Sequence, residues 1–341
     1  IVHSDSDEGI QRLNQEAAKA MARGLKAGLK ITPERAIQWI TSNAAKSLGI
    51  EDQTGSLQSG LMADIVVWSG NPFSVYAKAT NVFIDGVLNS GIFFNRTDKS
   101  VIIPAKWDSV ISTKFSTNIA SNGIEVKTVE HLLSALAGLH INNCEVLIDN
   151  IEVPILDGSS KVYVENILKT GVKEQDSEQN ILEIIKPVKF LCDYGYAELA
   201  PNSSRDQGLN INLESSFDGK YDDQDIKIRN LNGNYVESIS KARTFGFFQE
   251  IEYLKSQNLI KGGSLDNAIV IKDKKPLNKD GLRYENELMR HKVLDVVGDL
   301  YLSGYPIIGT YKGFKTGHFI TNNLLKELFK SEENYKIHKI N

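Results

Sequence analysis

The residue types that bind a divalent metal ion stand at two distant places in this sequence. Asp295 follows His291 by four residues, and far upstream Glu130 directly precedes His131. Residues four apart on a helix lie on one face, so the imidazole and the carboxylate of the first pair can reach one ion. Two imidazoles and a carboxylate form a ligand set that zinc accepts. The alternative is that these residues belong to a solvated polar face.

The segment around His291 must be helical for both side chains to reach one ion. Apolar residues recur there at spacings of four, three and four, on one stripe that is expected to be buried: Met289, Val293, Val296 and Leu300. A different stripe carries His291, Asp295 and Asp299. Burying an unpaired carboxylate is costly, and a cation or a hydrogen-bonded partner is the usual compensation. This helix supplies only two ligands, so folding must deliver the third.

Length and composition limit the class of protein. The chain has 341 residues, enough for two or three domains. Its net charge of -4, with acidic and basic residues interspersed, argues against nucleic acid or an anionic membrane as the main partner. It has no apolar run long enough to span a bilayer, and its first residues do not resemble a signal peptide. Two cysteines, Cys144 and Cys192, are too few for a disulfide framework, which favours a cytoplasmic location.

The first ninety residues show a helical pattern followed by short strands. Apolar residues recur at helical spacing over 9–29, and a second helix is expected from Thr32, with Pro33 in its first turn and Gly49 after its end. The segment GSLQSGLMADIVVW is typical of two short strands around a turn. The stretch SNAAKSLGIEDQTGSLQSGLMADIVVWSGNPF resembles the C-terminal part of an amidohydrolase of the imidazolonepropionase-like type.

The same resemblance gives a role to the first residues. It implies that Asp5, in His3-Ser4-Asp5, corresponds to the carboxylate at the end of the eighth barrel strand, which serves the metal and the attacking water. Such an enzyme takes most ligands from earlier strands, including a His-x-His pair, and this sequence contains no such pair. Residues 1–89 are therefore expected to be a chemically silent fragment. Amidohydrolase chemistry through Asp5 would need the missing barrel from another chain.

The character of the sequence changes at 89–91, where no Pro- or Ser-rich linker stands. Six separated motifs follow: TVEHLLSALAGL at 128–139, EVPILDGSS at 152–160, ARTFGF at 242–247, GGSLDNAIV at 262–270, RHKVLDVVGDLYL at 290–302 and TGHFITNN at 316–323. In this order they make the chain from Gly91 to about Asn323 resemble the UDP-3-O-acyl-N-acetylglucosamine deacetylases, zinc enzymes of lipid A biosynthesis.

The resemblance implies the roles of the metal-binding residues. His131, His291 and Asp295 correspond to the three zinc ligands, which leaves a fourth position open, as in a catalytic site. Glu130 corresponds to the carboxylate that takes a proton from the attacking water. Taken alone, His131 on its apolar helix would more readily be a satisfied core histidine.

The resemblance also implies residues that act on the substrate. His318 corresponds to the imidazole that stays protonated and helps the amine to leave, and Asp299 to the carboxylate that orients it. Thr244 corresponds to a hydroxyl that binds the developing tetrahedral oxygen; capping a turn is its alternative role. Lys292 corresponds to a cation that meets the nucleotide, or else it is solvated. Phe245 begins a segment that lines a passage for the acyl chain in the family, and it is assigned to substrate binding; packing in the core is the alternative role of this segment.

The family fold is α+β, with two successive domains that each pair a sheet with two helices and with the active site between them. Strand-like runs, CEVLIDNI and LEIIKPVKFL, alternate here with expected helices near 128–139, 160–170, 235–249 and 284–303. The expected domains are the amidohydrolase fragment 1–89, a first deacetylase domain 90–180 and a second one 181–341. The boundary lies in the polar stretch KEQDSEQN, and a βαβ insert is expected near 245–272.

Two departures from the family pattern leave two interpretations open. The strands and the Gly-Leu-His-Thr-Gly-like turn that open the first domain have no counterpart, and near Phe217 the usual His-Pro step is missing. In the first interpretation, the chain is a monomer that uses Zn²⁺ to hydrolyse the N-acetyl group of UDP-3-O-(3-hydroxyacyl)-N-acetylglucosamine. In the second, it is a catalytically poor fusion, or the misjoined product of an amidohydrolase fragment and a truncated deacetylase.

Overall fold

The chain forms two compact units, Ile1–Ser90 and Gly91–Asn341. The computed structural model describes residues 13–56, 65–68, 71–74, 79–83, 91–174, 178–203, 208–256, 260 and 262–340. His3 and Asp5 lie outside the described residues, as does most of the turn expected before Ile65. Among the described residues, no helix combines the length and the hydropathy that a membrane span requires.

The described part of the first unit contains short helices followed by an antiparallel pair of strands: α2 (Leu13–Lys26), α3 (Pro33–Gln38), α4 (Ser42–Leu48), β1 (Ile65–Trp68) and β2 (Ala79–Phe83). Thr32 caps α3 by accepting a hydrogen bond from the Arg35 amide, and Gly49 ends α4 with φ 70°. The single helix predicted between Thr32 and Gly49 is wrong. Thr41 leaves the helical region, and its hydroxyl donates to the Ile37 carbonyl at 3.0 Å.

The first half of the second unit contains two small sheets and two helices. In one sheet, β3 (Ile92–Arg96) lies between β4 (Val101–Pro104), which is antiparallel, and β8 (Cys144–Ile148), which is parallel. The other sheet is the antiparallel set β5 (Val110–Ser112), β6 (Asn118–Ser121) and β7 (Ile124–Val126), preceded by the 3-10 helix η1 (Trp107–Ser109). The predicted helices near 128–139 and 160–170 are confirmed as α5 (Glu130–Gly138) and α6 (Lys161–Thr170).

The second half is built on a seven-stranded sheet: β9 (Gln179–Ile184), β10 (Val188–Cys192), β11 (Gly195–Ala200), β12 (Leu209–Ser215), β13 (Gln224–Ile228), β17 (Ile307–Phe314) and β18 (Tyr335–Ile340). The central strand β17 pairs with β11, β12 and β9, and β9 pairs in turn with β18. Helices α9 (Glu287–Tyr301) and α10 (His318–Leu328) pack on this sheet, and the 3-10 helix η4 (Glu332–Asn334) precedes β18. The predicted helix near 284–303 is thereby confirmed.

A smaller group of elements lies between β13 and α9: the 3-10 helix η3 (Leu231–Gly233), α7 (Tyr235–Ser238), β14 (Phe245–Phe247), α8 (Phe248–Ser256), β15 (Ile269–Lys272) and β16 (Lys275–Pro276). Strands β14 and β15 run parallel, with α8 in the connection between them. The single helix predicted near 235–249 is wrong. It is interrupted because the main-chain amide of Thr244 donates to Gly158 O at 2.7 Å, and its carbonyl accepts from Ile269.

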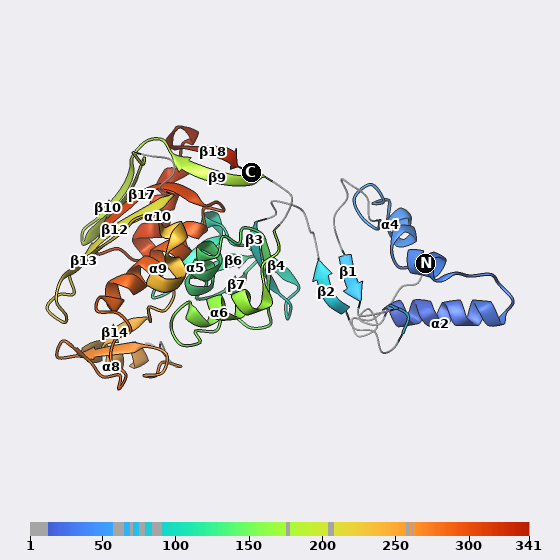
Figure 1. The fold of residues 1–341 in the computed structure, drawn as a ribbon, viewed down its shortest axis with the longest axis horizontal. Helices are drawn as coiled ribbons and strands as arrows, with labels where there is room; N and C mark the ends of the chain where they lie inside the picture. The colour runs from blue at the N-terminus through green and yellow to red at the C-terminus, as the bar shows by residue number, and fades with distance from the viewer. Residues whose placement is uncertain are drawn as a thin grey trace. The chain divides into compact units, whose positions relative to one another are not determined.

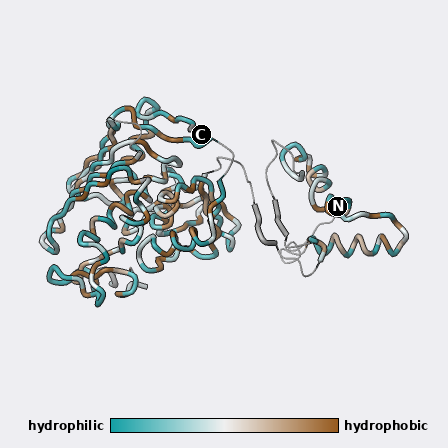
Figure 2. The backbone as a smooth tube through the Cα atoms, viewed as in Figure 1, coloured by the Kyte–Doolittle hydropathy of each residue, from teal (hydrophilic) through white to brown (hydrophobic). Residues whose placement is uncertain are grey.

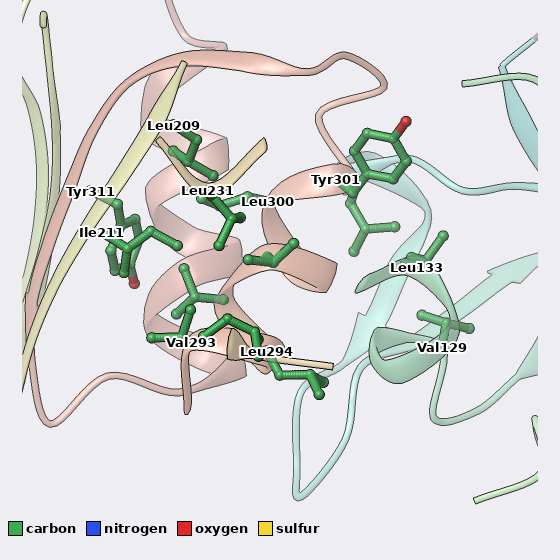
Figure 3. Packing of buried hydrophobic residues seen from close by; sticks show 14 of the residues in the cluster. Val129, Leu133, Leu209, Ile211, Leu231, Val293, Leu294, Leu300, Tyr301 and Tyr311 are labelled. Carbon is green, nitrogen blue, oxygen red and sulfur yellow. The ribbon is translucent and has the colours of Figure 1, made fainter. Parts of the chain in front are cut away.

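Helix α9 joins the two halves of the second unit. Figure 1 shows α5, α9 and α10 between the large sheet and the small sheets. In Figure 3, Val293 of α9 lies on the side of Ile211 and Tyr311 of the large sheet, and Leu294 of α9 lies on the side of Val129, directly before α5; all five are fully buried. Figure 2 shows apolar and polar residues interspersed along the backbone. Helix α9 is buried on nearly all sides, with 12 of its 15 residues buried. The fold is α+β, as predicted; the domain boundaries near 90 and 180 stay a prediction.

Candidate metal centre

Two packed helices bring the three predicted ligands together. His131 lies in the first turn of α5, and His291 and Asp295 lie one turn apart on α9. One ligand atom of each lies within 4.8 Å of the other two. Asp295 Oδ1 is 3.5 Å from Nε2 of His131 and 3.4 Å from Nε2 of His291. The two imidazole rings stand edge to face, with centroids 5.0 Å apart.

Buried lone pairs face one another in this cluster. His291 Nδ1 lies 3.1 Å from the Ala242 carbonyl oxygen, which can only accept, so Nδ1 carries the proton and Nε2 keeps its lone pair. Burial lowers the pKa of His291 to about 4, so the ring is neutral at neutral pH. Asp295 Oδ1 is buried and has no hydrogen-bond partner among the described residues. A cation satisfies such a group of atoms, so these residues can hold a metal ion.

The Ala242 carbonyl is held in place by a buried ion pair at the next residue. Arg243 donates from Nε to Glu287 Oε1 at 2.9 Å, and from Nη2 to Oε2 at 3.1 Å. The main-chain amide of Arg243 also donates to Glu287 Oε1 at 3.0 Å. Glu287 is fully buried and lies one turn before His291 on α9. The pair therefore fixes the loop whose carbonyl orients the His291 ring.

Glu130 lies beside the metal centre, at the start of α5. Its side chain is 3% exposed, and Oε2 accepts a hydrogen bond from the Thr117 main-chain amide at 3.0 Å. Oε1 lies 3.9 Å from Nε2 of His318. Burial raises the pKa of Glu130 because the charged form loses its hydration, although the charge of His318 opposes this.

His318 and Asp299 form a hydrogen-bonded pair. His318 is the first residue of α10, and its Nδ1 donates to Asp299 Oδ2 at 2.8 Å. Burial alone would lower the pKa of His318, but the charge and the hydrogen bond of Asp299 outweigh it and raise the pKa to about 10. Glu130 and Asp295 add to this shift. The imidazolium is therefore the form present at neutral pH.

No pattern in the sequence points to Thr117, a further residue of this group. Thr117, just before β6, donates from its hydroxyl to Asp299 Oδ1 at 2.6 Å, in addition to the amide contact with Glu130. It stands in a short polar stretch, Ser116-Thr117-Asn118, without a charge or a recognisable spacing. Arg243 and Glu287 were also missed, although Arg243 lies inside a motif and a buried arginine needs a partner.

The remaining predicted residues lie around the cluster. Thr244 follows the Ala242–Arg243 loop, and its main chain bonds to Gly158 and Ile269. The ring of Phe245 contacts that of His291 edge to face, with centroids 6.1 Å apart. Lys292 points to the segment before α10, where Nζ donates to the Thr316 carbonyl at 3.0 Å. Burial lowers the pKa of Lys292.

Comparison with known proteins matches most of the chain to one family of enzymes. Residues 62–330 match the family described as UDP-3-O-acyl N-acetylglycosamine deacetylase. The UDP-3-O-acyl-N-acetylglucosamine deacetylase of Psychrobacter arcticus is 42% identical over 255 residues, which cover 73% of this chain and 78% of that protein. The one from Nautilia profundicola is 43% identical over 244 residues (72% and 82%), and the one from Vibrio parahaemolyticus 39% over 278 residues (80% and 90%).

The α+β fold places a buried glutamate and a histidine beside a set of possible metal ligands. Together with these matches, this arrangement defines a deacetylase. The chain belongs to the UDP-3-O-acyl N-acetylglycosamine deacetylase family. Residues 4–103 also match the amidohydrolase family, so both predicted resemblances are confirmed. The two matches overlap over 62–103, whereas the structural units meet between Ser90 and Gly91.

Proposed function

We propose that this chain removes the N-acetyl group of UDP-3-O-(3-hydroxyacyl)-N-acetylglucosamine and releases acetate, as a step of lipid A biosynthesis, with Zn²⁺ as its metal ion. One observation carries the proposal: His131, His291 and Asp295 converge beside a buried glutamate and a histidine that is tied to an aspartate. The relatives described above are named UDP-3-O-acyl-N-acetylglucosamine deacetylase, which is the activity proposed here.

The ligand set fits zinc. Imidazole nitrogen suits zinc, whereas magnesium and calcium take oxygen ligands. A tetrahedral ion with bonds of about 2.0–2.1 Å would separate its ligand atoms by about 3.3–3.4 Å. Asp295 Oδ1 lies 3.4 and 3.5 Å from the two imidazole nitrogens. Zinc, when bound, polarises the amide carbonyl and makes water more acidic.

In the proposed reaction, Glu130 is the general base. Its Oε2 already accepts the amide of Thr117, so Oε1 is the atom that takes the proton from the attacking water. The water oxygen forms a bond to the amide carbonyl carbon. The pKa of Glu130 is raised by burial, which makes the carboxylate a stronger base than an exposed one.

His318 is the proposed general acid. Its Nδ1 is committed to Asp299, so Nε2, which faces Glu130, is the nitrogen that donates. As the carbon–nitrogen bond breaks, the leaving nitrogen takes the Nε2 proton and departs as a neutral amine. Asp299 orients the ring and stabilises its positive charge.

Three further residues are proposed to contact the substrate. The Thr244 hydroxyl would donate to the tetrahedral oxygen, close to the loop that orients His291. Phe245, against the His291 ring, would contact the acyl portion. Lys292 would meet the nucleotide, since its Nζ is directed toward the segment that precedes α10. The monomeric state and the cytoplasmic location stay predictions.

The second interpretation, a catalytically poor fusion, keeps one observation in its favour. The chain divides into two units, and the amidohydrolase match, over residues 4–103, covers most of the first unit, which has no barrel among its described residues. Bound zinc without turnover would support this interpretation over the first.

Acetate release from the purified chain, with and without zinc, tests the proposal. Glu130→Gln and His131→Ala are expected to abolish most of the activity. The first should keep the bound zinc and the second should lose it. His338→Gln is the matched control, because His338 of β18 pairs with Glu183 of β9 and is not one of the three predicted ligands. Full turnover in Glu130→Gln would contradict the assigned base.

A further inference from the structure

Four residues, Glu130, His318, Asp299 and Thr117, form a ring of polar contacts beside the metal centre. His318 Nδ1 donates to Asp299 Oδ2 at 2.8 Å, and His318 Nε2 lies 3.9 Å from Glu130 Oε1. Thr117 closes the ring on the other side. Its hydroxyl donates to Asp299 Oδ1 at 2.6 Å, and its main-chain amide donates to Glu130 Oε2 at 3.0 Å. Thr117 is thus bonded to the partner of the proposed acid and to the proposed base.

The main chain holds Thr117 in this position. Its carbonyl accepts the amide of Val129, directly before α5, at 3.2 Å. The next side chain, Asn118, accepts the amide of Thr128 at 3.2 Å. Thr117 itself is 1% exposed. These two hydrogen bonds connect the region of β6 to the start of α5. They hold Thr117 in place, so its hydroxyl is positioned to donate to Asp299 of α9.

Both carboxylate oxygens of Asp299 accept a hydrogen bond within this ring. The Thr117 hydroxyl donates to one oxygen and the His318 imidazole to the other, so both oxygens are acceptors and the proton stays on the imidazole. Without the hydroxyl, Asp299 would keep a single donor in a buried place and could rotate away from the ring nitrogen. A donor lost from a buried carboxylate is costly.

We propose that Thr117 is a positioning residue for the reaction, whose hydroxyl holds Asp299 in the orientation that keeps His318 aligned for proton donation. The inference rests on the proposed function for its effect on turnover. Thr117 acts through Asp299 and does not touch the substrate in this assignment.

Thr117→Val tests the hydroxyl, because valine has nearly the same shape and the main-chain amide to Glu130 remains. The kcat for acetate release is expected to fall about 10- to 100-fold, the range for a hydrogen bond to a charged group, with KM little changed. Thr117→Ser keeps a hydroxyl and is expected to restore most of the kcat. Thr128→Val is the control, since Thr128 also donates to a carboxylate, that of Glu152, at 2.8 Å, outside the ring.

A second measurement does not depend on activity. The Nδ1 proton of His318, which is hydrogen-bonded to a carboxylate and buried, is expected to give a low-field proton NMR signal that is absent in His318→Gln. Thr117→Val should shift this signal and speed its exchange with water, and Thr117→Ser should not. If wild-type turnover is absent while the signal behaves this way, the proposed function fails and the positioning by Thr117 stands. An unchanged signal and kcat in Thr117→Val, or equal losses in the serine variant, would overturn the inference.

Discussion

Gly298 of α9 lies directly against the main-chain carbonyl of Glu130 at the start of α5. A β-carbon at position 298 would come within 2.0 Å of the Glu130 carbonyl oxygen. Only a residue without a side chain lets the two helices approach so closely here. Gly298 follows Asp295 by three residues and Glu130 directly precedes His131, so the distance between the helices at this contact also affects the distance between these ligands.

Gly298→Ala is therefore expected to push α9 away from α5. Overpacking of this kind costs about 1–3 kcal/mol of unfolding free energy, and the ligands would separate. The expected result is a lower unfolding midpoint in urea, together with weaker zinc binding measured by competition with a chromophoric chelator. Zinc affinity equal to that of the unmutated chain would mean that the helices can adjust without moving the ligands.

Gly233→Ala provides the control for this substitution. Nothing lies within 4 Å of the position that its β-carbon would take, and its φ is not positive. It should leave both the unfolding midpoint and the zinc affinity unchanged.

The sequence predicted the part of the site that depends on local spacing. His291 and Asp295 are four residues apart within an apolar helical pattern, and α9 places them on one face as expected. The third ligand, His131, could be predicted only from the family resemblance, because no periodicity links position 131 to position 291. Thr117 and the Arg243–Glu287 pair were not predicted, for the same reason: each acts through a contact between residues more than forty positions apart in the sequence.

The errors in the fold also come from tertiary contacts. The segment 235–249 has a helical pattern, yet it becomes a short helix, a loop and a strand, because the main chain of Thr244 binds Gly158 on one side and Ile269 on the other. The strand-like run LEIIKPVKFL is likewise divided, into β9 and β10, because Pro187 lies between them and has no amide to donate.

Glu287→Gln is expected to destabilise the second unit strongly. Removing one partner of a buried ion pair typically costs about 3–5 kcal/mol, because the other charge is left uncompensated. The Glu287 carboxylate also accepts main-chain amides of Arg243 and Arg283, which a glutamine can satisfy only in part. Urea denaturation measures the loss. Asp222→Asn, at the exposed pair with Lys274, is the control and should leave stability unchanged.

Pairing Glu287→Leu with Arg243→Met separates charge from hydrogen bonding. Replacing both members of a buried ion pair by apolar residues is often neutral. Here the main-chain amides of positions 243 and 283 would lose their acceptor, so the double variant is expected to stay less stable than the original chain. A double variant with full stability would show that charge compensation is the only role of the pair.

The His318–Asp299 pair predicts how stability changes with pH. The pKa of His318 is raised from 6.5 to about 10 in the folded chain, so its contribution is fully present below pH 6.5 and is lost as the pH rises through about 10. In zinc-free protein, the free energy of unfolding should therefore decrease between these pH values. Asp299→Asn removes the main source of the shift and should flatten this part of the curve. A slope that persists in Asp299→Asn would assign the effect to another group.

Zinc is expected to stabilise the chain through His131, His291 and Asp295. A ligand that binds only the folded state at 100 times its Kd adds about 2.7 kcal/mol to the free energy of unfolding. The midpoint temperature of thermal unfolding should therefore rise when zinc is added and fall back when a chelator removes it. Magnesium, which prefers oxygen ligands, should change the midpoint little. His131→Ala and Asp295→Asn should remove the response, and His338→Gln should keep it. A zinc response that survives in His131→Ala would place the bound ion elsewhere in the chain.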